Sequence, residues 1–439
     1  MTADQTEPTP LVRWSRRGVV VAYLLLALSY TVIIPHGFGP DEGMHFDYVR
    51  YLGAYWELPQ TNEAPGGLKP HSQHPPAYYC LLLPFYLVSR PVGPEATYVV
   101  LRLVSVALGL GFVLFTAGTI GVLVPRPAWL RWYVAGVVGL LPHFQLYAAI
   151  VHNDALTNAL SAAFLWCVVR HLDARAQPRL VAPLGVLAGI GALTKGSLVV
   201  ALPFAFALVL AARLGRSFWR TGAFWRGTVM LVAIQVFVGG WWYLRRYLAL
   251  GSLSLIPSGH AAIPEEMGLW EALFTGPVAY LAARGVEGLF RTTWAQPGWI
   301  PPYTLPVFYV AFALWVLGAL VAFVVFVRRR RDPEGVQHAG RFLVATPVLY
   351  YVWVYLWVLY TAVFLHMGHL QGGRYAFPAL GGLALLLAMP LLVLGGRRLR
   401  IAFAAATLAL LAAANAVSIH TLVTILTPFY APGWDYLFF

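Results

Sequence analysis

Carboxylates that could act in catalysis occur at two points where long apolar runs begin or end. Asp41 and Glu42 are adjacent and follow Gly39 and Pro40, and Asp154 lies between two apolar stretches. A carboxylate can serve as the general base that removes a proton from a reacting hydroxyl group. Either aspartate could instead cap the helix that follows it, because aspartate is favoured at helix N-caps. Asp41, Glu42 and Asp154 are therefore the candidate catalytic residues.

Cationic side chains form a second group of candidates. Lys195 lies between two short apolar runs, Arg245 and Arg246 lie near the end of a long one, and Arg374 precedes another. Guanidinium and ammonium groups bind phosphate oxygens, which suits an anionic substrate. Pairing with the acids or with lipid headgroups is the alternative. With their polar and aromatic neighbours, the candidate substrate-binding residues are His74, Tyr78, Lys195, Arg245, Arg246, Gln371, Arg374 and Tyr375.

The segment Gln73–Tyr79 combines His74 with two prolines and two tyrosines. The prolines impose an extended entry, and the tyrosines either contact a substrate or line the membrane interface, where aromatic residues are enriched. A metal site built from Asp41, His45, His71 and His74 is conceivable. Its spacing matches no recognised zinc pattern, so we expect neither a metal ion nor another cofactor.

Together these residue types suit transfer of a sugar from a lipid phosphate. An aspartate would deprotonate the acceptor hydroxyl while its oxygen attacks the sugar carbon, through an oxocarbenium-like transition state as in glycoside hydrolysis. Arginine or lysine would stabilise the charge on the departing phosphate. The elements of the chain must therefore bring the acids and the cations to the same side of the fold.

The composition indicates a polytopic membrane protein. Of 439 residues, 59% are hydrophobic and only 11% are charged, whereas a soluble domain has roughly 25% charged residues. The composition excludes a soluble enzyme and a disordered chain. A spanning helix needs about 20 apolar residues, and apolar windows predict an all-α fold with about eleven transmembrane helices. The predicted spans are Val19–Ile34, Leu101–Val124, Trp132–Val151, Ala155–Val169, Val181–Leu193, Leu198–Leu210, Val229–Leu248, Leu305–Val327, Phe342–Leu365, Phe377–Leu394 and Ile401–Leu426.

Two segments outside these spans are predicted to lie at the membrane surface. Pro76–Val88 is apolar but short, which favours a re-entrant or interfacial segment. Downstream of Asp41, apolar residues recur at helical spacing, which predicts an interfacial helix. The residues on its predicted apolar stripe are Met44, Tyr48, Leu52 and Tyr55.

We interpret the net charge of +13 as orientation charge and not as affinity for nucleic acid, because lysine and arginine collect in cytoplasmic loops. This predicts a cytoplasmic N-terminus and a candidate site on the extracytoplasmic face of the plasma (inner) membrane. The chain has no Gly-x-x-x-x-Gly-Lys phosphate loop, which disfavours an ATP-driven pump. The predicted organisation is one transmembrane domain over residues 1–439, with a first outer loop at 36–100 and a second at 249–304.

Five segments in this order resemble the GT-C-fold membrane glycosyltransferases: Pro40–Leu52, His74–Tyr79, Asn153–Leu156, Leu193–Lys195 and Gly373–Leu380. The greatest similarity is to bacterial members near the protein O-mannosyltransferase and lipid A aminoarabinose transferase group. The resemblance implies a polyprenyl-phosphate-sugar donor, an inverting reaction on the outer face with Asp41 as base, and a binding role for Asp154. The acceptor would be a lipid, a glycan or a protein. Members often carry a soluble domain or further spans after the tenth, so we expect acceptor recognition here from the outer loops or a partner.

Two other classes of function fit the composition. A lipid flippase or solute transporter would favour internal repeats and broken helices at the membrane midplane, but the sequence shows no clear repeat. A non-catalytic scaffold that binds polyprenyl lipids would dispense with the acid of the first loop, whereas Asp41 and Glu42 are both present.

Overall fold

The computed structural model describes residues 10–173, 175–215, 217–250, 290–294, 306–329 and 373–426. Within these ranges every regular element is helical, which confirms the predicted all-α class, and one isolated bridge joins Ala64 to Leu68. The predicted span Phe342–Leu365, the candidate Gln371 and nearly all of the second outer loop lie outside the described residues.

The helices follow one another with short connections. The first half of the chain forms α1 (Pro10–Ile33), α2 (Glu42–Tyr55), η1 (Pro65–Gly67), α3 (Ala77–Ser89), η2 (Arg90–Val92), α4 (Pro94–Leu123), α5 (Leu130–Gly139), α6 (Pro142–Ala148), α7 (Asp154–His171), α8 (Pro178–Ala192) and α9 (Leu198–Leu214). The second half forms η3 (Phe218–Arg220), α10 (Gly222–Leu250), α13 (Pro306–Arg329), η4 (Gly373–Ala379), α15 (Leu380–Leu387), α16 (Met389–Val393), α17 (Arg397–Thr421) and η5 (Leu422–Leu426).

Six of the described helical segments are long and apolar enough to cross a membrane, which supports a multi-pass membrane protein. They are Pro10–Ile33, Pro94–Leu123, Gly222–Ala249, Pro306–Phe326, Gly373–Val393 and Arg397–Thr424, and α8 and α9 are shorter apolar helices. Apolar side chains on their outer faces stay exposed, as a lipid environment allows; Val32 is 84% exposed and Phe237 is 87% exposed.

The predicted span Trp132–Val151 is wrong as a single helix. The chain forms α5 and α6 instead, because Leu141 is extended and Pro142 starts a new helix at its favoured first position. The segment Pro76–Val88 is a regular helix, α3, with Pro84 inside it. The stripe predicted for α2 is partly wrong as well, since Tyr48 and Leu52 are buried but Tyr55 is exposed.

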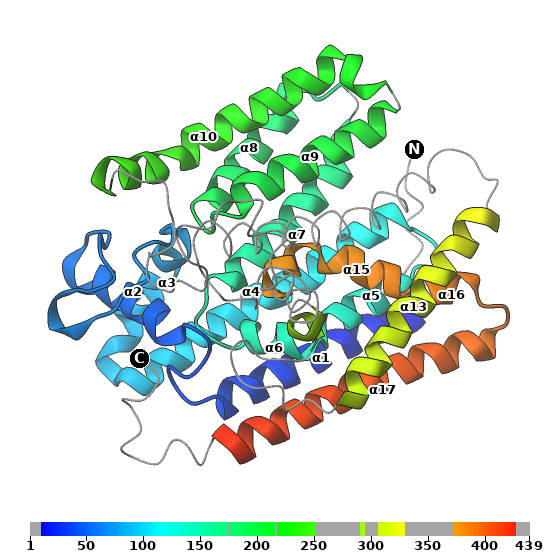
Figure 1. Ribbon diagram of the computed structural model, residues 1–439, viewed down its shortest axis with the longest axis horizontal. Helices are drawn as coiled ribbons and strands as arrows, with labels where there is room; N and C mark the ends of the chain where they lie inside the picture. Colours follow the sequence, from blue (N-terminus) through cyan, green and yellow to red (C-terminus); the bar gives the residue numbers. More distant parts are fainter. Residues whose placement is uncertain are drawn as a thin grey trace, which may run out of the picture.

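The spanning helices pack in layers that bury one large apolar core (Figure 1). Helix α4 packs against α5 and α7, and α8 packs against α9 and α10. At the crossing of α8 and α10, a Cβ atom on Gly239 would lie 2.8 Å from the backbone oxygen of Gly189. Glycine is required there, and small residues at helix crossings are typical of membrane proteins.

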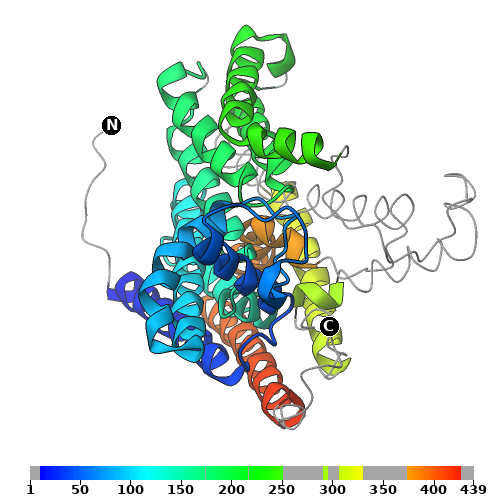
Figure 2. The same cartoon turned by 90° about the vertical axis from the view of Figure 1, so that its left-hand side faces the viewer.

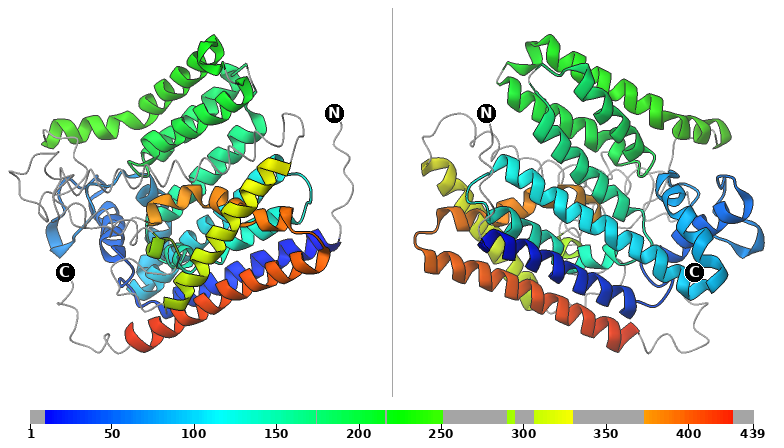
Figure 3. Two further views of the ribbon diagram at one scale, coloured as in Figure 1. Left: turned by 45° about the vertical axis from the view of Figure 1, so that its right-hand side comes forward. Right: turned by 180° about the vertical axis from the view of Figure 1, so that it is seen from behind.

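The first outer loop forms one end of the molecule. Helices α1 and α17 both begin at the opposite end and run side by side (Figures 1 and 3). Figure 2 views the loop end directly, with α2, α3 and the chain between them nearest the viewer. A second apolar cluster fastens α2 to α3 and α4, in which Tyr48 stacks on Tyr79 at 3.7 Å and Phe46 on Tyr98 at 3.8 Å between ring centroids.

Candidate active site

Asp41 lies in a tight turn at the start of α2. Its backbone is left-handed, with φ of 59°, a conformation that aspartate tolerates better than most residues. The turn is closed by Glu42 N–H, which donates to the Gly39 carbonyl at 2.9 Å. Gly39 is needed because a Cβ atom there would lie 2.8 Å from the side chain of Ile150. Asp41 occupies the N-cap position of α2, but its carboxylate makes no capping hydrogen bond.

Asp154 lies at the first position of α7 and is almost completely buried, with 2% of its side chain exposed. It is ion-paired with Lys195, which follows α8 in a turn where the Lys195 N–H donates to Gly191. Isolated charges are costly to bury, and a paired ammonium compensates the carboxylate. His152 adds a contact between its Nδ1 and Asp154 Oδ2 at 3.3 Å.

Arg374 joins the two aspartates. Its Nη2 lies 3.3 Å from Asp41 Oδ2, and its Nε lies 3.9 Å from Asp154 Oδ2. Its Nη1 donates to the Tyr147 hydroxyl at 3.0 Å and lies 3.3 Å from His152 Nε2. The residue comes from η4, far along the chain from both acids. Four separate segments thus meet at this guanidinium, and we call Asp41, Asp154, Lys195 and Arg374 the charged cluster.

Aromatic rings surround the cations of the charged cluster. Lys195 Nζ lies 4.6 Å from the centre of the Tyr375 ring, and the Arg374 guanidinium carbon lies 5.3 Å from the rings of Tyr375 and Tyr147. Cations are attracted to the faces of aromatic rings at such distances. The rings therefore hold the cations in place while leaving their charge unneutralised.

Glu42 is completely buried and lies in a different environment from Asp41. Its carboxylate receives two hydrogen bonds from Arg102, from Nε and Nη2 at 2.7 Å each, and a third from the Val151 N–H at 2.9 Å. Arg102 also donates to the carbonyls of Thr31, Ile34 and Pro35. This bidentate pair fastens the first outer loop to α1 and α4, on the protein side of Asp41.

Three histidines gather next to the charged cluster: His45 on α2, and His71 and His74 in the loop before α3. Their ring centroids lie 5.0 to 5.3 Å apart, and the ring of His45 lies 4.2 Å from that of His152. Burial, with the neighbouring histidines and Arg374, lowers the pKa of His45 well below its ordinary value. Burial and His71 do the same to the pKa of His74, so both imidazoles are neutral at neutral pH.

The remaining candidates lie around these groups. Arg245 and Arg246, near the end of α10, donate to carbonyls of the first outer loop: Arg245 to Leu58 at 3.2 Å, and Arg246 to Gln60 and Ser72 at 3.3 and 3.4 Å. Neither is ion-paired with a carboxylate among the described residues. The hydroxyl of the fully buried Tyr78 is hydrogen-bonded to Ser105 at 2.9 Å.

Sequence reasoning missed three residues that the structure brings to this region. His152 and Tyr147 contact Arg374, and Arg102 holds Glu42. His152 stands two positions before Asp154, in a sequence segment already singled out. An arginine within the apolar run that becomes α4 also needs a partner, which was a usable signal for Arg102.

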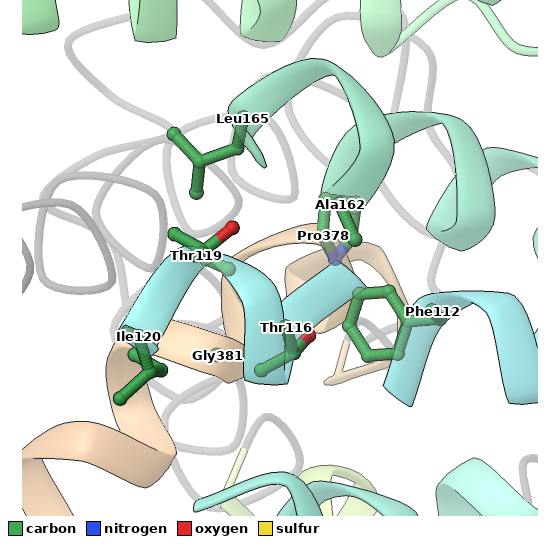
Figure 4. A pocket seen from close by; sticks show the side chains of 10 residues that line it. Phe112, Thr116, Thr119, Ile120, Ala162, Leu165, Pro378 and Gly381 are labelled. Carbon is green, nitrogen blue, oxygen red and sulfur yellow. The ribbon is translucent and has the colours of Figure 1, made fainter. Parts of the chain in front are cut away.

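A small apolar cavity lies elsewhere, between α4, α7 and the segment from η4 to α15 (Figure 4). Phe112, Leu165 and Pro378 line it, and its polar side chains are the threonines Thr116 and Thr119. It contains no titratable side chain, so it offers no group for acid–base or phosphate chemistry. The charged cluster is the better candidate for a reaction site.

No family model matches the sequence, and no curated protein matches it. Solved structures do match. ArnT from Cupriavidus metallidurans bound to undecaprenyl phosphate superposes with a TM-score of 0.51 at 15% identity, over 94% of this chain and 77% of that chain. The archaeal oligosaccharyltransferase AglB from Archaeoglobus fulgidus, in complex with an inhibitory peptide and a dolichol-phosphate, superposes with a TM-score of 0.50 at 14% identity, over 93% of this chain.

The chain spans 56% of the length of AglB, so it matches only part of that protein. At these identities the similarity concerns the fold. It agrees with the helical architecture described above and with the resemblance that the ordered sequence segments indicate. This chain therefore has the GT-C-like membrane fold that it shares with ArnT and AglB.

Proposed function

We propose that the protein is a glycosyltransferase that moves a sugar from a polyprenyl-phosphate donor to an acceptor at the outer face of the membrane. The observation that carries the proposal is the charged cluster, in which Arg374 lies 3.3 Å from Asp41. Asp41 is its accessible acid, with 38% of the side chain exposed, whereas Asp154 is 2% exposed and held by Lys195. Undecaprenyl phosphate bound to ArnT and dolichol-phosphate bound to AglB support a lipid phosphate as the carrier.

In the proposed reaction, the Asp41 carboxylate takes the proton from the acceptor hydroxyl. The hydroxyl oxygen forms a bond to the anomeric carbon, while the bond from that carbon to the phosphate oxygen breaks and its electron pair leaves with the phosphate. Attack opposite the leaving group inverts the anomeric centre. General-base catalysis of this kind contributes about 10²–10⁴-fold in rate.

The leaving phosphate requires cations that are not already neutralised. Lys195 is paired with Asp154, and Arg374 is shared between the two aspartates. Arg245 and Arg246 instead donate to backbone carbonyls, so their positive charge is available to a phosphate. We assign the phosphate to Arg245 and Arg246, and the orientation of the sugar and of Asp41 to Arg374.

Glu42 and Asp154 then act as positioning residues. Glu42 fixes the turn that carries Asp41, because it also accepts a hydrogen bond from the Gly39 N–H at 3.3 Å. Asp154 holds Lys195 and Arg374 at the border of the site. Neither carboxylate needs to meet the substrate for these roles.

The distribution of arginine supports an extracytoplasmic site. Arg13, Arg16 and Arg17 lie in the first turns of α1, and Arg397, Arg398 and Arg400 in the first turn of α17. Both helices begin at the end of the molecule opposite α2 and α3 (Figure 3). Because cytoplasmic ends of spans collect arginine, we place the N-terminus in the cytoplasm and the charged cluster outside.

The test is transfer by the Asp41→Asn variant in proteoliposomes that contain a polyprenyl-phosphate sugar and an acceptor mixture of lipids, glycans and peptides. The exchange keeps the size of the side chain but removes the base, so transfer should fall by about 10²–10⁴-fold while donor binding persists. Glu63→Gln, an exposed acid of the same loop, is the matched control and should transfer at the wild-type rate.

Transfer by Asp41→Asn at the wild-type rate would contradict the assignment of the base. Translocation of the lipid across the bilayer by the wild type, without transfer to any acceptor, would instead favour the flippase class. Thermal unfolding of each variant, measured in detergent, separates loss of chemistry from loss of fold.

A further inference from the structure

The three histidines beside the charged cluster bring their ring nitrogens close together. One nitrogen from each of His45, His71 and His74 lies within 4.8 Å of the other two. The imidazoles come from two elements, α2 and the loop before α3, and the sequence spacing shows no known metal motif. In a tetrahedral site with zinc–nitrogen bonds of about 2.0–2.1 Å, ligand nitrogens stand roughly 3.4 Å apart, so small side-chain movements would bring these nitrogens to an ion.

The hydrogen bonds of the rings leave one particular nitrogen free on two of them. His45 Nδ1 lies 2.8 Å from the Tyr79 hydroxyl, and His71 Nδ1 lies 2.8 Å from the side-chain amide of Gln73. The Nε2 atoms of His45 and His71 are buried and have no hydrogen-bond partner within the described part of the chain. Buried polar atoms without partners are rare in native structures and call for an explanation.

This arrangement matches the surroundings of histidine ligands in metalloproteins. A ligating imidazole donates its other ring N–H to an oxygen, which fixes the tautomer and orients the ring. The Tyr79 hydroxyl does this for His45. Gln73 does it for His71 when the amide is turned to present its oxygen, and that oxygen is itself buried without a partner. Amide oxygen and nitrogen are interchangeable by such a turn.

The backbone holds the loop histidines against α2. The His71 N–H donates to the Met44 carbonyl at 3.4 Å, and the His74 N–H donates to the His71 carbonyl at 3.0 Å. The Tyr48 hydroxyl donates to the His74 carbonyl at 3.4 Å. The three imidazoles are therefore held together by the fold, even though only His45 lies on a helix.

We propose that His45, His71 and His74 bind one divalent transition-metal ion, zinc by preference. Neutral imidazoles suit zinc, copper and nickel, whereas magnesium and calcium require oxygen ligands. Three protein ligands leave a fourth position open to water or to a substrate oxygen. His152 is not among the ligands, because its Nδ1 accepts from the Asp154 N–H at 3.0 Å and its Nε2 lies 3.3 Å from Arg374.

The ion would lie beside the charged cluster, since the ring of His45 lies 4.2 Å from that of His152, which contacts Arg374. An ion there would add a localised positive charge to the outer face. Binding of zinc does not depend on the proposed transfer reaction. The metal content is measured without a sugar donor, so failure of this inference and failure of the proposed function are separate results.

The test is direct metal analysis of the purified full-length protein in detergent. After chelation, wild-type protein reloaded with zinc should hold one equivalent by mass spectrometry, and zinc should raise its melting temperature. Cobalt in place of zinc should give the visible absorption of a tetrahedral ion. His45→Ala, His71→Ala and His74→Ala should each lose the equivalent and the zinc-dependent rise. His36→Ala, a histidine stacked on Tyr98 outside the cluster, should keep both.

Tyr79→Phe gives a test that does not remove a ligand. It deletes only the hydroxyl that orients His45, and loss of such a contact weakens metal binding by about 10–100-fold. Wild-type protein that takes up no zinc would overturn the inference. So would a His71→Ala variant that binds zinc as the wild type does, or a Tyr79→Phe variant with wild-type affinity.

Discussion

Arg374 Nη2 lies 3.3 Å from Asp41 Oδ2, although 333 positions separate the two residues in the sequence. The same guanidinium lies 3.9 Å from Asp154 through Nε and donates to Tyr147 through Nη1. One side chain therefore links the start of α2, the end of α6 and the start of α7. The geometry of the whole charged cluster depends on it.

Arg374→Ala should weaken binding of a polyprenyl-phosphate sugar. Hydrogen bonds to charged groups contribute about 1.5–3 kcal/mol each, so loss of one such contact predicts an affinity about 10- to 150-fold lower. Arg374→Lys should recover only part of this, because lysine has the charge but cannot contact Asp41, Tyr147 and His152 together. The measurement is a titration of the labelled donor in detergent.

Arg50→Ala is the matched control for Arg374→Ala. Arg50 is an exposed arginine of α2 paired with Asp47, and its loss should leave donor affinity unchanged. Equal affinities for the wild type and Arg374→Ala would remove Arg374 from the donor site.

Arg246→Ala should also lower donor affinity, and it should reduce the dependence of that affinity on salt. Arg246 has no carboxylate partner within the described ranges and its buried Nε is unpartnered, so its charge is available to a phosphate. Contacts between exposed charges weaken as salt is added, and removing one lowers the salt sensitivity. Donor titrations at several salt concentrations check this.

Arg226→Ala tests whether that effect is specific to the outer end of α10. Arg226 is exposed near the other end of the same helix and donates to the Arg175 carbonyl. Its removal should change neither the affinity nor its salt dependence. An identical loss in Arg226→Ala and Arg246→Ala would argue against a phosphate site at Arg246.

Arg102→Leu should destabilise the protein strongly. The pair of Arg102 and Glu42 is completely buried, and removing one partner of such a pair costs about 3–5 kcal/mol because it leaves an uncompensated charge. The melting temperature in detergent should fall well below that of the wild type. Arg50→Ala, which breaks an exposed pair, should cost at most about 1 kcal/mol, and a wild-type melting temperature for Arg102→Leu would contradict the structural role of the pair.

The sequence predicted the membrane class and the meeting of the charged residues. Charge sidedness placed Asp41, Asp154, Lys195 and Arg374 on one side of the membrane, and the structure brings all four together. This worked because hydropathy and loop charge are local signals, and because elements that end at the same face have few ways to avoid one another.

The sequence could not separate the roles of Asp41 and Glu42. They are adjacent, yet one faces Arg374 and the other is buried against Arg102, and a left-handed turn at Asp41 directs them apart. The break before Pro142 and the gathering of His71 and His74 against His45 were also beyond local patterns. Each depends on packing between segments that the order of residues does not reveal.

The central claim is that a donor phosphate and the base Asp41 meet at one site on the outer face. The most direct measurement is a density map of the full-length protein with a polyprenyl-phosphate sugar bound. We expect the phosphate within hydrogen-bond distance of Arg245 or Arg246, about 3 Å, with the sugar between Arg374 and Asp41. A phosphate remote from both Asp41 and Arg374 would contradict the account.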